Sequence, residues 1–244
     1  MSTCWAFTLA YNEGDFIAHW VRHYRSFCER VTVYVDTDTN DSTASQAVAL
    51  GADVRWHRTG GLDDVAFVAF AQDRYKEARG HVDWVVWVDA DEILYHPRLP
   101  TRLGDLRAQG VTLPQVQGYQ MVSERPPSGA APIYQQIKRG IPAREYSKVC
   151  VFDPALDVRW AVGKHTAEVP GAVHDDGSDP LRLLHYRYLG EAWLRGRNAR
   201  NYARMGEGQL GRRHGVETYP DHEGPYSPAW YAEQTANAQE VVGG

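Results

Sequence analysis

The segment Trp84-Val85-Val86-Trp87-Val88-Asp89-Ala90-Asp91-Glu92 joins an apolar run to a cluster of carboxylates. The apolar run predicts a strand over 84–89 that is buried on both faces. Asp89 and Asp91 follow it directly, so both side chains can point at one site beyond the end of the strand. Clustered oxygen ligands suit Mg²⁺ or Mn²⁺, which in turn bind phosphates. The alternative is structural, with Asp89 capping a helix or pairing with an arginine.

The chain before this segment alternates between strand and helix patterns. Three earlier strands are predicted at 4–10, 30–36 and 53–57, and three helices at 13–28, 42–50 and 63–79. In the first helix, apolar residues from Phe16 to Cys28 recur at the spacing of one helical face. This alternation implies an α/β fold, with a mostly parallel sheet flanked by helices.

The second half of the chain has a less regular pattern. We predict helices at 98–109, about 190–206 and 228–240, strands at 115–124, 146–152, 156–162 and 181–187, and loops at 125–144 and from 207 onward. We expect one domain for the 244 residues, because two domains would each be near the lower end of the usual size range.

Composition excludes several classes of protein. Lys and Arg total 26 against 31 Asp and Glu, and the net charge of −5 argues against a general DNA- or RNA-binding protein. No stretch reaches the ~18 to 20 apolar residues of a membrane span, and the first residues lack the basic region of a secretory signal. The 3 widely spaced cysteines favour reduced thiols over disulfides or a cysteine zinc site. We therefore expect a cytoplasmic protein, free or at the inner face of a membrane with at most peripheral contact.

Two other predicted strands also end in polar residues. Asn12 and Glu13 follow the strand at 4–10, and Asp36 opens the segment Asp36-Thr37-Asp38-Thr39-Asn40-Asp41. Because ligands of open parallel sheets bind beyond the carboxyl ends of the strands, we expect these clusters to share one site with 89–92. The segment starting at Asp36 also begins like a calcium loop, but it lacks the Gly and Glu that such a loop needs further on.

Asp36 has two further interpretations. With Asp38 it resembles the D-x-D-x-T nucleophile motif of haloacid-dehalogenase-type phosphatases, whose first Asp becomes phosphorylated. That motif usually closes the first strand of its fold, whereas here an earlier strand precedes it. Alternatively, Asp36 accepts hydrogen bonds from a nucleobase or ribose, while Asp41-Ser42-Thr43 caps the next helix.

Together these motifs resemble family 2-type glycosyltransferases of the GT-A fold, which is Rossmann-like. The resemblance covers 5–95 and rests on Asn12-Glu13, Trp20, His23-Tyr24, Val35-Asp36, Asp41-Ser42-Thr43 and Trp84 through Glu92. It is closest to the single-domain bacterial branch, which has a W-x-x-H helix and a D-x-D-E strand end. It continues thinly through Lys148-Val149, Gly163-Lys164-His165 and Leu184-His185-Tyr186. It implies a nucleotide-sugar-binding half at 1–95 and an acceptor-binding half with C-terminal helices at 96–244.

The resemblance also implies roles for individual residues on the donor side. The donor would be a nucleoside-diphosphate sugar, and its base and ribose would contact Asn12, Glu13, Asp36 and, nearby, Gln72. At the Mn²⁺ or Mg²⁺ site, Asp91 would be the direct ligand, Asp89 would face the ribose or a metal-bound water, and His185 would be a second ligand. The cation would bridge both donor phosphates and stabilise the negative charge that develops as the glycosidic bond breaks.

The acceptor side is less defined. Lys148 and His165 are the candidate contacts for an acceptor hydroxyl on a glycan, a lipid-linked molecule or a small molecule. Members of the family mostly invert the anomeric configuration with a carboxylate base. The candidate base is Glu124, after the strand at 115–124, and the alternatives are Glu145, Asp175 and Asp176.

The helix at 190–206 and its flanks are rich in arginine, with Arg187, Arg195, Arg197, Arg200, Arg204, Arg212 and Arg213. These side chains could bind the diphosphate, an anionic acceptor or lipid headgroups. They could equally form a solvated face with pairs such as Glu191–Arg195.

The sequence therefore predicts a metal-dependent glycosyltransferase of the hexosyltransferase type, with Asp91 and Glu124 as catalytic residues and no nucleic-acid partner. Two alternatives stay open. One is a phosphatase that uses Asp36 and Asp38, and the other is a non-catalytic module that binds nucleotide sugars.

Overall fold

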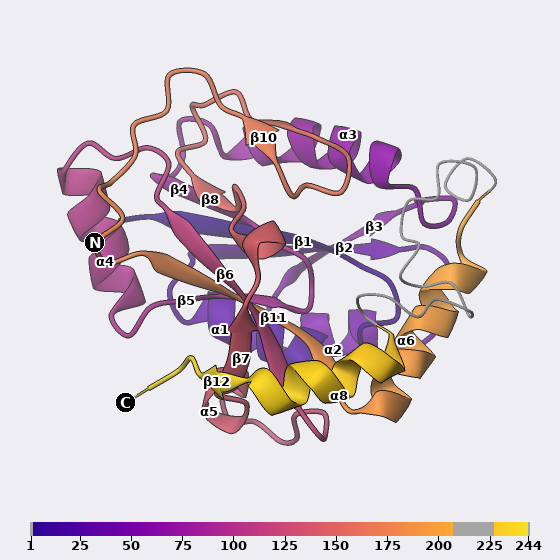
Figure 1. Ribbon diagram of the computed structural model, residues 1–244. Coiled ribbons are helices and arrows are strands. Elements are labelled where there is room, and N and C mark those ends of the chain that lie inside the picture. Colours follow the sequence, from indigo (N-terminus) through magenta and orange to yellow (C-terminus); the bar gives the residue numbers. More distant parts are fainter. Residues whose placement is uncertain (1, 207–226, 244) are drawn as a thin grey trace.

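The computed structural model describes residues 2–206 and 227–243 and contains two five-stranded sheets (Figure 1). In the first sheet, four parallel strands stand in the order β3 (Asp53–His57), β2 (Arg30–Asp36), β1 (Cys4–Ala10) and β4 (Trp84–Trp87). β8 (Val151–Phe152) pairs with β4 in the antiparallel direction at the edge. The predicted bounds of β1, β2 and β3 are confirmed, and the α/β class with flanking helices is confirmed as well.

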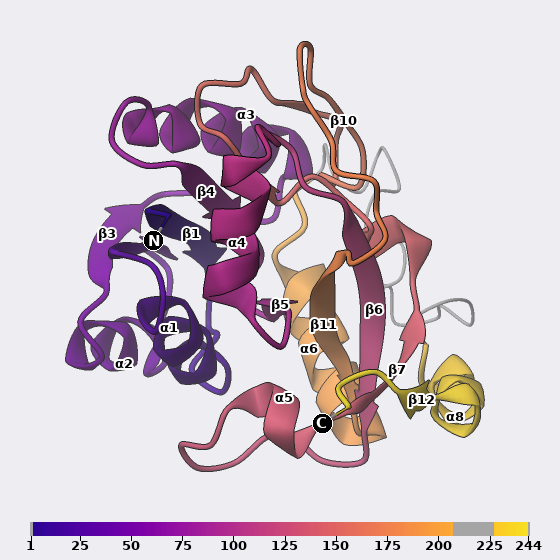
Figure 2. The same cartoon turned by 90° about the vertical axis from the view of Figure 1, so that its left-hand side faces the viewer.

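Helices cover both faces of the first sheet (Figure 2). α1 (Ile17–Arg25) and α2 (Thr43–Ala49) lie on one face, and α3 (Asp64–Arg74) with the 3₁₀ turn η1 (Tyr75–Ala78) lies on the other. α1 begins later than predicted, because the backbone N–H groups of Phe16 and Ile17 both donate to the carbonyl of Glu13 in a turn that precedes the helix. The N-terminus of α3 is capped by Asp63, whose carboxylate accepts the backbone N–H of Val65.

The second sheet corrects the expectation of a single, mostly parallel sheet. Its order is β12 (Gln239–Glu240), β7 (Arg139–Pro142), β6 (Val116–Ser123), β11 (Leu181–Leu189) and β5 (Glu92–Tyr95). Only β6 and β11 run parallel there, and the other pairs are antiparallel. β5 was not predicted, because its residues directly continue the apolar and acidic run that ends β4.

The less regular elements lie around these sheets. They are α4 (Leu99–Ala108), α5 (Ile133–Gln136), η2 (Arg144–Tyr146), β9 (Arg159–Trp160), β10 (Ala167–Glu168), α6 (Glu191–Ala203) and α8 (Pro228–Asn237). The predicted loop at 125–144 therefore contains a helical turn and β7, and the predicted strand at 146–152 is reduced to β8. A strand of two residues is too short to show any periodicity in a sequence.

Buried apolar side chains form separate clusters on the two faces of the first sheet. The larger cluster joins Trp20 and Tyr24 of α1 to Leu183 and Leu184 of β11, so it extends from the first sheet to the second. The other contains Phe7 and Trp87 of the sheet together with Tyr75 of η1. In residues 2–206 and 227–243, no helix combines the length and the apolar character needed to cross a membrane.

Candidate active site

The predicted metal motif occupies the turn that carries the chain from the first sheet to the second. β4 ends at Trp87 and β5 begins at Glu92, and the backbone N–H of Glu92 donates to the carbonyl of Asp89 at 3.0 Å. This turn places Asp89 and Asp91 beyond the end of β4, where a ligand of a parallel sheet binds. The sequence thus located the motif correctly at a strand end, although not at a junction between sheets.

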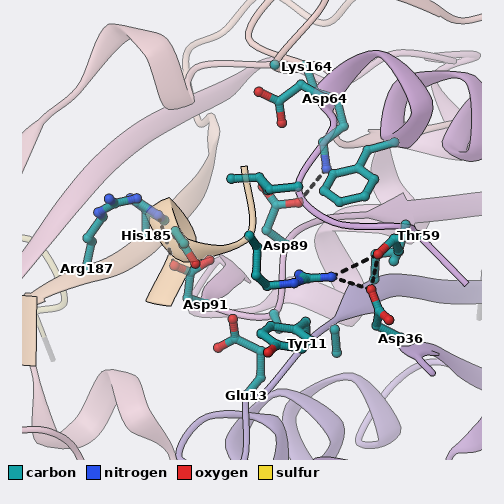
Figure 3. A pocket seen from close by; sticks show the side chains of 18 of the residues that line it. Tyr11, Glu13, Asp36, Thr59, Asp64, Asp89, Asp91, Lys164, His185 and Arg187 are labelled. Carbon is teal, nitrogen blue, oxygen red and sulfur yellow. Dashed lines mark hydrogen bonds and ion pairs between the residues drawn. The ribbon is translucent and has the colours of Figure 1, made fainter. Parts of the chain in front are cut away.

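A cavity of about 520 Å³ opens at this junction (Figure 3). It is bordered by the carboxyl ends of β1, β2 and β4, by β11 and by α6. Its polar lining includes Tyr11, Glu13, Asp36, Thr59, Asp64, Asp89, Asp91, Lys164, His165, His185, Arg187, Arg197, Asn201 and Arg204. The structure therefore brings together six of the predicted site residues, namely Glu13, Asp36, Asp89, Asp91, His165 and His185.

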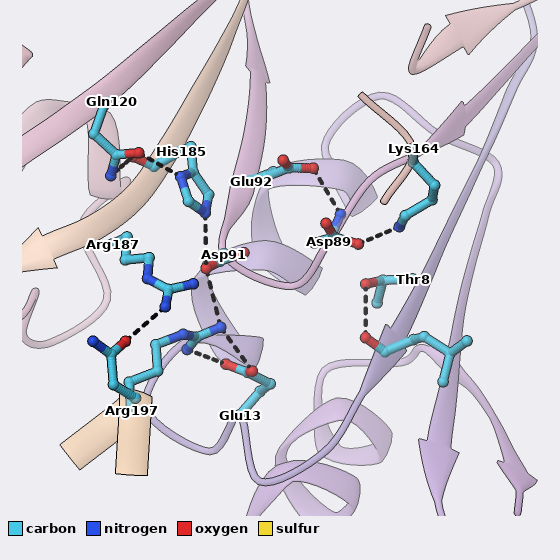
Figure 4. A network of polar contacts seen from close by, with 12 residues as sticks. Thr8, Glu13, Asp89, Asp91, Glu92, Gln120, Lys164, His185, Arg187 and Arg197 are labelled. Atoms are coloured by element: carbon cyan, nitrogen blue, oxygen red, sulfur yellow. Dashed lines mark hydrogen bonds and ion pairs between the residues drawn. The ribbon is translucent and has the colours of Figure 1, made fainter. Parts of the chain in front are cut away.

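Asp91 is the centre of a buried charge network (Figure 4). Its Oδ2 lies 3.2 Å from Nε2 of His185 and 3.0 Å from a guanidinium nitrogen of Arg197. Arg197 in turn donates to both carboxylate oxygens of Glu13, at 2.8 and 2.9 Å. Burial alone would raise the pKa of Asp91, but Arg197 and His185 outweigh it and hold that pKa well below its ordinary value. Asp91 is therefore ionised and able to bind a cation at neutral pH.

Asp89 lies on the rim of the cavity, with 46% of its side chain exposed. Its Oδ1 accepts a hydrogen bond from Nζ of Lys164, and its Oδ2 is 3.6 Å from Nζ of Lys148. Burial would raise the pKa of Asp89, but these two ammonium groups outweigh it and hold the pKa below its ordinary value. Both oxygens of Asp89 thus face lysines, which does not favour Asp89 as a direct metal ligand.

Lys148 and Glu92 form a buried pair behind the turn. Nζ of Lys148 lies 2.6 Å from Oε1 of Glu92, and the two side chains are 3% and 0% exposed. Oε2 of Glu92 accepts the backbone N–H of Asp89 at 2.9 Å, so the pair supports the turn directly. Lys148 does not line the cavity. This position favours a supporting role over the predicted contact with an acceptor.

The opposite side of the cavity is formed by Asp36 and Tyr11. Asp36 is fully buried at the end of β2, and its Oδ2 accepts hydrogen bonds from Thr59 and Arg204. The guanidinium of Arg204 also stacks on the ring of Tyr11, 3.5 Å from its centroid. A flat group with N–H donors, the Arg204 guanidinium, therefore occupies the space between the Tyr11 ring and the Asp36 carboxylate.

Several predicted residues lie outside the cavity. Asn12 has a left-handed backbone and exchanges two hydrogen bonds of 3.0 Å with Asn40, so it joins the ends of β1 and β2 instead. Gln72 on α3 does not line the cavity. Glu124 is exposed and does not line the cavity either. It lies beside Gly190, at the N-terminal end of α6. The cavity is at the opposite end of that helix, where Arg204 enters it.

The alternative bases are not in the cavity lining either. Asp175 is buried against Arg102, at 3.1 Å, and accepts the backbone N–H of Gln115. Asp176 is exposed and accepts hydrogen bonds from Ser178. Glu145 is exposed, and its backbone carbonyl contacts Nδ1 of His165. Asp175 and Asp176 therefore stabilise the loop around them and do not face the cavity.

Five residues that line the cavity and form the contacts described above were given no individual role from the sequence, namely Tyr11, Thr59, Lys164, Arg197 and Arg204. The arginine-rich helix was the available signal. Arg197 and Arg204 are seven positions apart, which is about two helical turns, so they share a face. Arg195 instead forms the exposed pair with Glu191 that was the alternative expectation. Arg212 and Arg213 lie outside the described residues.

The described side chains around Asp91 offer few protein ligands for a divalent cation. Within 2–206 and 227–243, no cluster of three or more His, Cys, Asp or Glu side chains is arranged to hold a metal. Asp91 and His185 nevertheless form a carboxylate–imidazole pair that lines the cavity. Mg²⁺ is commonly held by one or two protein carboxylates together with substrate phosphates. Two protein ligands with additional phosphate oxygens therefore suffice, and the pair fits Mn²⁺ or Mg²⁺.

The geometry does not favour the phosphatase interpretation. Asp36, the nucleophile in that interpretation, is fully buried and bonded to both Thr59 and Arg204. Asp38, the second carboxylate of the motif, is exposed and does not line the cavity. The two side chains therefore do not converge on one ligand.

No model of a known protein family matches the chain, and no curated protein sequence matches it. Among solved structures, a complex of glucosyl-3-phosphoglycerate synthase from Mycobacterium tuberculosis with Mn²⁺, UDP and glucosyl-3-phosphoglycerate is 22% identical, with a TM-score of 0.36 over 48% of this chain and 44% of that chain. A mycobacterial protein is 24% identical, with a TM-score of 0.35 over 49% and 42%. The chain thus spans less than half the length of these structures. Similarity at this level carries no functional conclusion.

Proposed function

We propose that this protein is a metal-dependent glycosyltransferase, which moves a sugar from a nucleoside-diphosphate donor to an acceptor hydroxyl. The observation that carries the proposal is the Asp91–His185 pair, which lines the same cavity as Asp36 and Tyr11. A cation site and a subsite for a flat polar base within one cavity match the two ends of a nucleotide diphosphate. A non-catalytic module that binds nucleotide sugars is the alternative, and it predicts binding without turnover.

The proposed donor lies across the cavity from Asp36 to His185. Its base takes the position that the Arg204 guanidinium occupies, stacked on Tyr11 with an N–H against Asp36, so the Arg204 side chain has to move aside when the donor binds. Its diphosphate lies between Asp91 and Lys164, which both line the cavity. The Lys164 ammonium contacts Asp89 on the rim, where it can contribute positive charge to the phosphates.

During transfer, negative charge accumulates on the departing diphosphate. The cation, when bound, neutralises part of that charge as a Lewis acid. Asp91 and His185 would hold it, Arg197 keeps Asp91 and Glu13 aligned, and Lys164 adds a second positive charge. His165, at the exposed edge of the cavity, is the proposed contact for a glycan, lipid-linked or small-molecule acceptor.

The experiment is thermal unfolding with UDP-, GDP-, dTDP- and CMP-linked sugars, each with and without Mn²⁺. A donor at about 100 times its dissociation constant adds roughly 2.7 kcal/mol of stability, which raises the midpoint by about 5–10 °C for a chain of this size. We expect one nucleotide class to give this shift only with Mn²⁺. Asp38→Asn is the matched control, since it alters an exposed carboxylate outside the cavity. A shift of equal size without metal would contradict the proposal.

A further inference from the structure

Gln120 is a buried side chain of β6 that contacts His185 in two places (Figure 4). Only 2% of its surface is exposed. Its Oε1 lies 2.7 Å from Nδ1 of the His185 ring, and its Nε2 donates to the backbone carbonyl of His185 at 3.4 Å. The two residues are direct neighbours across the parallel pair of β6 and β11.

These two contacts fix the orientation of the amide. If the amide were reversed, its oxygen would face the carbonyl oxygen of His185, and two acceptors would oppose each other. With the observed orientation, Oε1 faces Nδ1, so Nδ1 carries the proton and donates it to Gln120. On the other side of the ring, Nε2 lies 3.2 Å from Oδ2 of Asp91, so the ring nitrogen that Gln120 does not contact faces the proposed cation site.

The ring itself is held in place from other directions. It stacks on Tyr146, with centroids 4.0 Å apart and an interplanar angle of 24°. The backbone of His185 pairs with Glu92 of β5 on the other side of β11, and the next N–H, that of Tyr186, donates to the carbonyl of Asp91 at 2.9 Å. The sheet and Tyr146 thus set the position of the ring, and Gln120 holds Nδ1 on one side so that Nε2 faces Asp91.

We propose that Gln120 is a positioning residue for the cation site, because it accepts a hydrogen bond from Nδ1 of His185 and so keeps Nε2 directed at Asp91. This inference rests on the proposed function, in which Asp91 and His185 hold the metal. A hydrogen bond to the second ring nitrogen of a metal-binding histidine generally fixes its tautomer and orientation, and its loss typically weakens metal binding 10–100-fold. Gln120 lies outside the cavity lining, so it acts only through His185.

The test is titration with Mn²⁺ in the presence of UDP, with free Mn²⁺ measured by electron paramagnetic resonance. Gln120→Met keeps the length of the side chain but removes both contacts, and we expect Mn²⁺ to bind about 10–100-fold more weakly. Gln120→Glu retains an acceptor for Nδ1, and we expect it to bind Mn²⁺ more tightly than Gln120→Met. Gln117→Met is the matched control, because Gln117 is exposed on the same strand.

A second measurement reports on the Nδ1 proton without metal. In ¹⁵N spectra, we expect Nδ1 of the wild-type His185 ring to carry a proton that is protected from exchange by Gln120, and we expect this protection to be lost in Gln120→Met. An Nδ1 without a proton in the wild type would overturn the inference even if Gln120→Met failed to fold. Equal Mn²⁺ affinity in the wild type and in folded Gln120→Met would also overturn it. If the wild type bound no Mn²⁺ with any nucleotide, the proposed function itself would fail.

Discussion

Removing the charge of Lys148 should destabilise the protein strongly, because its partner Glu92 is completely buried. In Lys148→Met, the Glu92 carboxylate loses the ammonium at 2.6 Å and is left in the interior without its counter-charge. Breaking a buried ion pair in this way costs about 3–5 kcal/mol. A chain of 244 residues loses roughly 2–4 °C in midpoint for each kcal/mol, so the expected decrease is about 6–20 °C.

The assay is thermal and urea unfolding of Lys148→Met, with Arg195→Met as the control. Arg195 pairs with Glu191 at 2.8 Å, but those side chains are 63% and 56% exposed, so its removal should cost less than about 1 kcal/mol. The double variant Lys148→Met with Glu92→Gln should be more stable than Lys148→Met alone, since no buried charge is left unpaired. If Lys148→Met were as stable as Arg195→Met, the turn would not depend on the buried pair.

The Lys148–Glu92 pair should also make the stability of the protein depend on pH. Although burial lowers the pKa of Lys148, Glu92 and Asp89 outweigh it and raise the pKa above its ordinary value. For a lysine with a raised pKa, the stabilisation is present below the ordinary value of about 10.4 and is lost as the pH rises through the folded-state pKa. Urea unfolding between pH 9 and pH 11 should therefore show less loss of stability with increasing pH in Lys148→Met than in the wild type.

Three further predictions concern other parts of the fold. Burial lowers the pKa of His23 to about 4, so below the ordinary pKa of about 6.5 the unfolded state binds more protons than the folded state. The free energy of unfolding should therefore fall by about 2 kcal/mol from pH 7 to pH 5, and it should fall less in His23→Gln. A Cβ at Gly118 would lie 2.2 Å from the backbone of Tyr146, so Gly118→Ala should cost about 1–3 kcal/mol in urea unfolding, and an unchanged midpoint would refute this close approach. Arg204→Ala leaves the buried Asp36 without its cation, and a loss of about 3–5 kcal/mol is expected in the same assay; a loss below 1 kcal/mol would show that the pair is not formed.

The sequence predicted the parts of the fold that depend on local periodicity. β1, β2 and β3 have enough residues to show a strand pattern, and the acidic residues after β2 and β4 marked the edge where the cavity lies. β8, β9 and β10 consist of two residues each, and their pairing depends on distant partners rather than on a local pattern.

The ion pairs of the candidate site that the sequence did not reveal also join residues that are far apart in the chain. Arg197 and Glu13 are separated by 184 positions, and Arg204 and Asp36 by 168. No pattern in the sequence specifies which arginine of a helix meets which carboxylate of a sheet. Glu124 lies outside the cavity because it follows the end of β6 beside Gly190, whereas the cavity is lined by His185 and Arg187 from within the neighbouring strand β11.

The most direct test of metal-dependent glycosyl transfer is donor turnover. The release of nucleoside diphosphate from the donor identified by thermal unfolding would be measured with Mn²⁺ and with EDTA, in the wild type, in Asp91→Asn and in Asp38→Asn. The account predicts turnover that needs Mn²⁺, is lost in Asp91→Asn, and persists in Asp38→Asn, since Asp91 faces His185 in the cavity and Asp38 is exposed outside it. Turnover that persists in EDTA or in Asp91→Asn would contradict it.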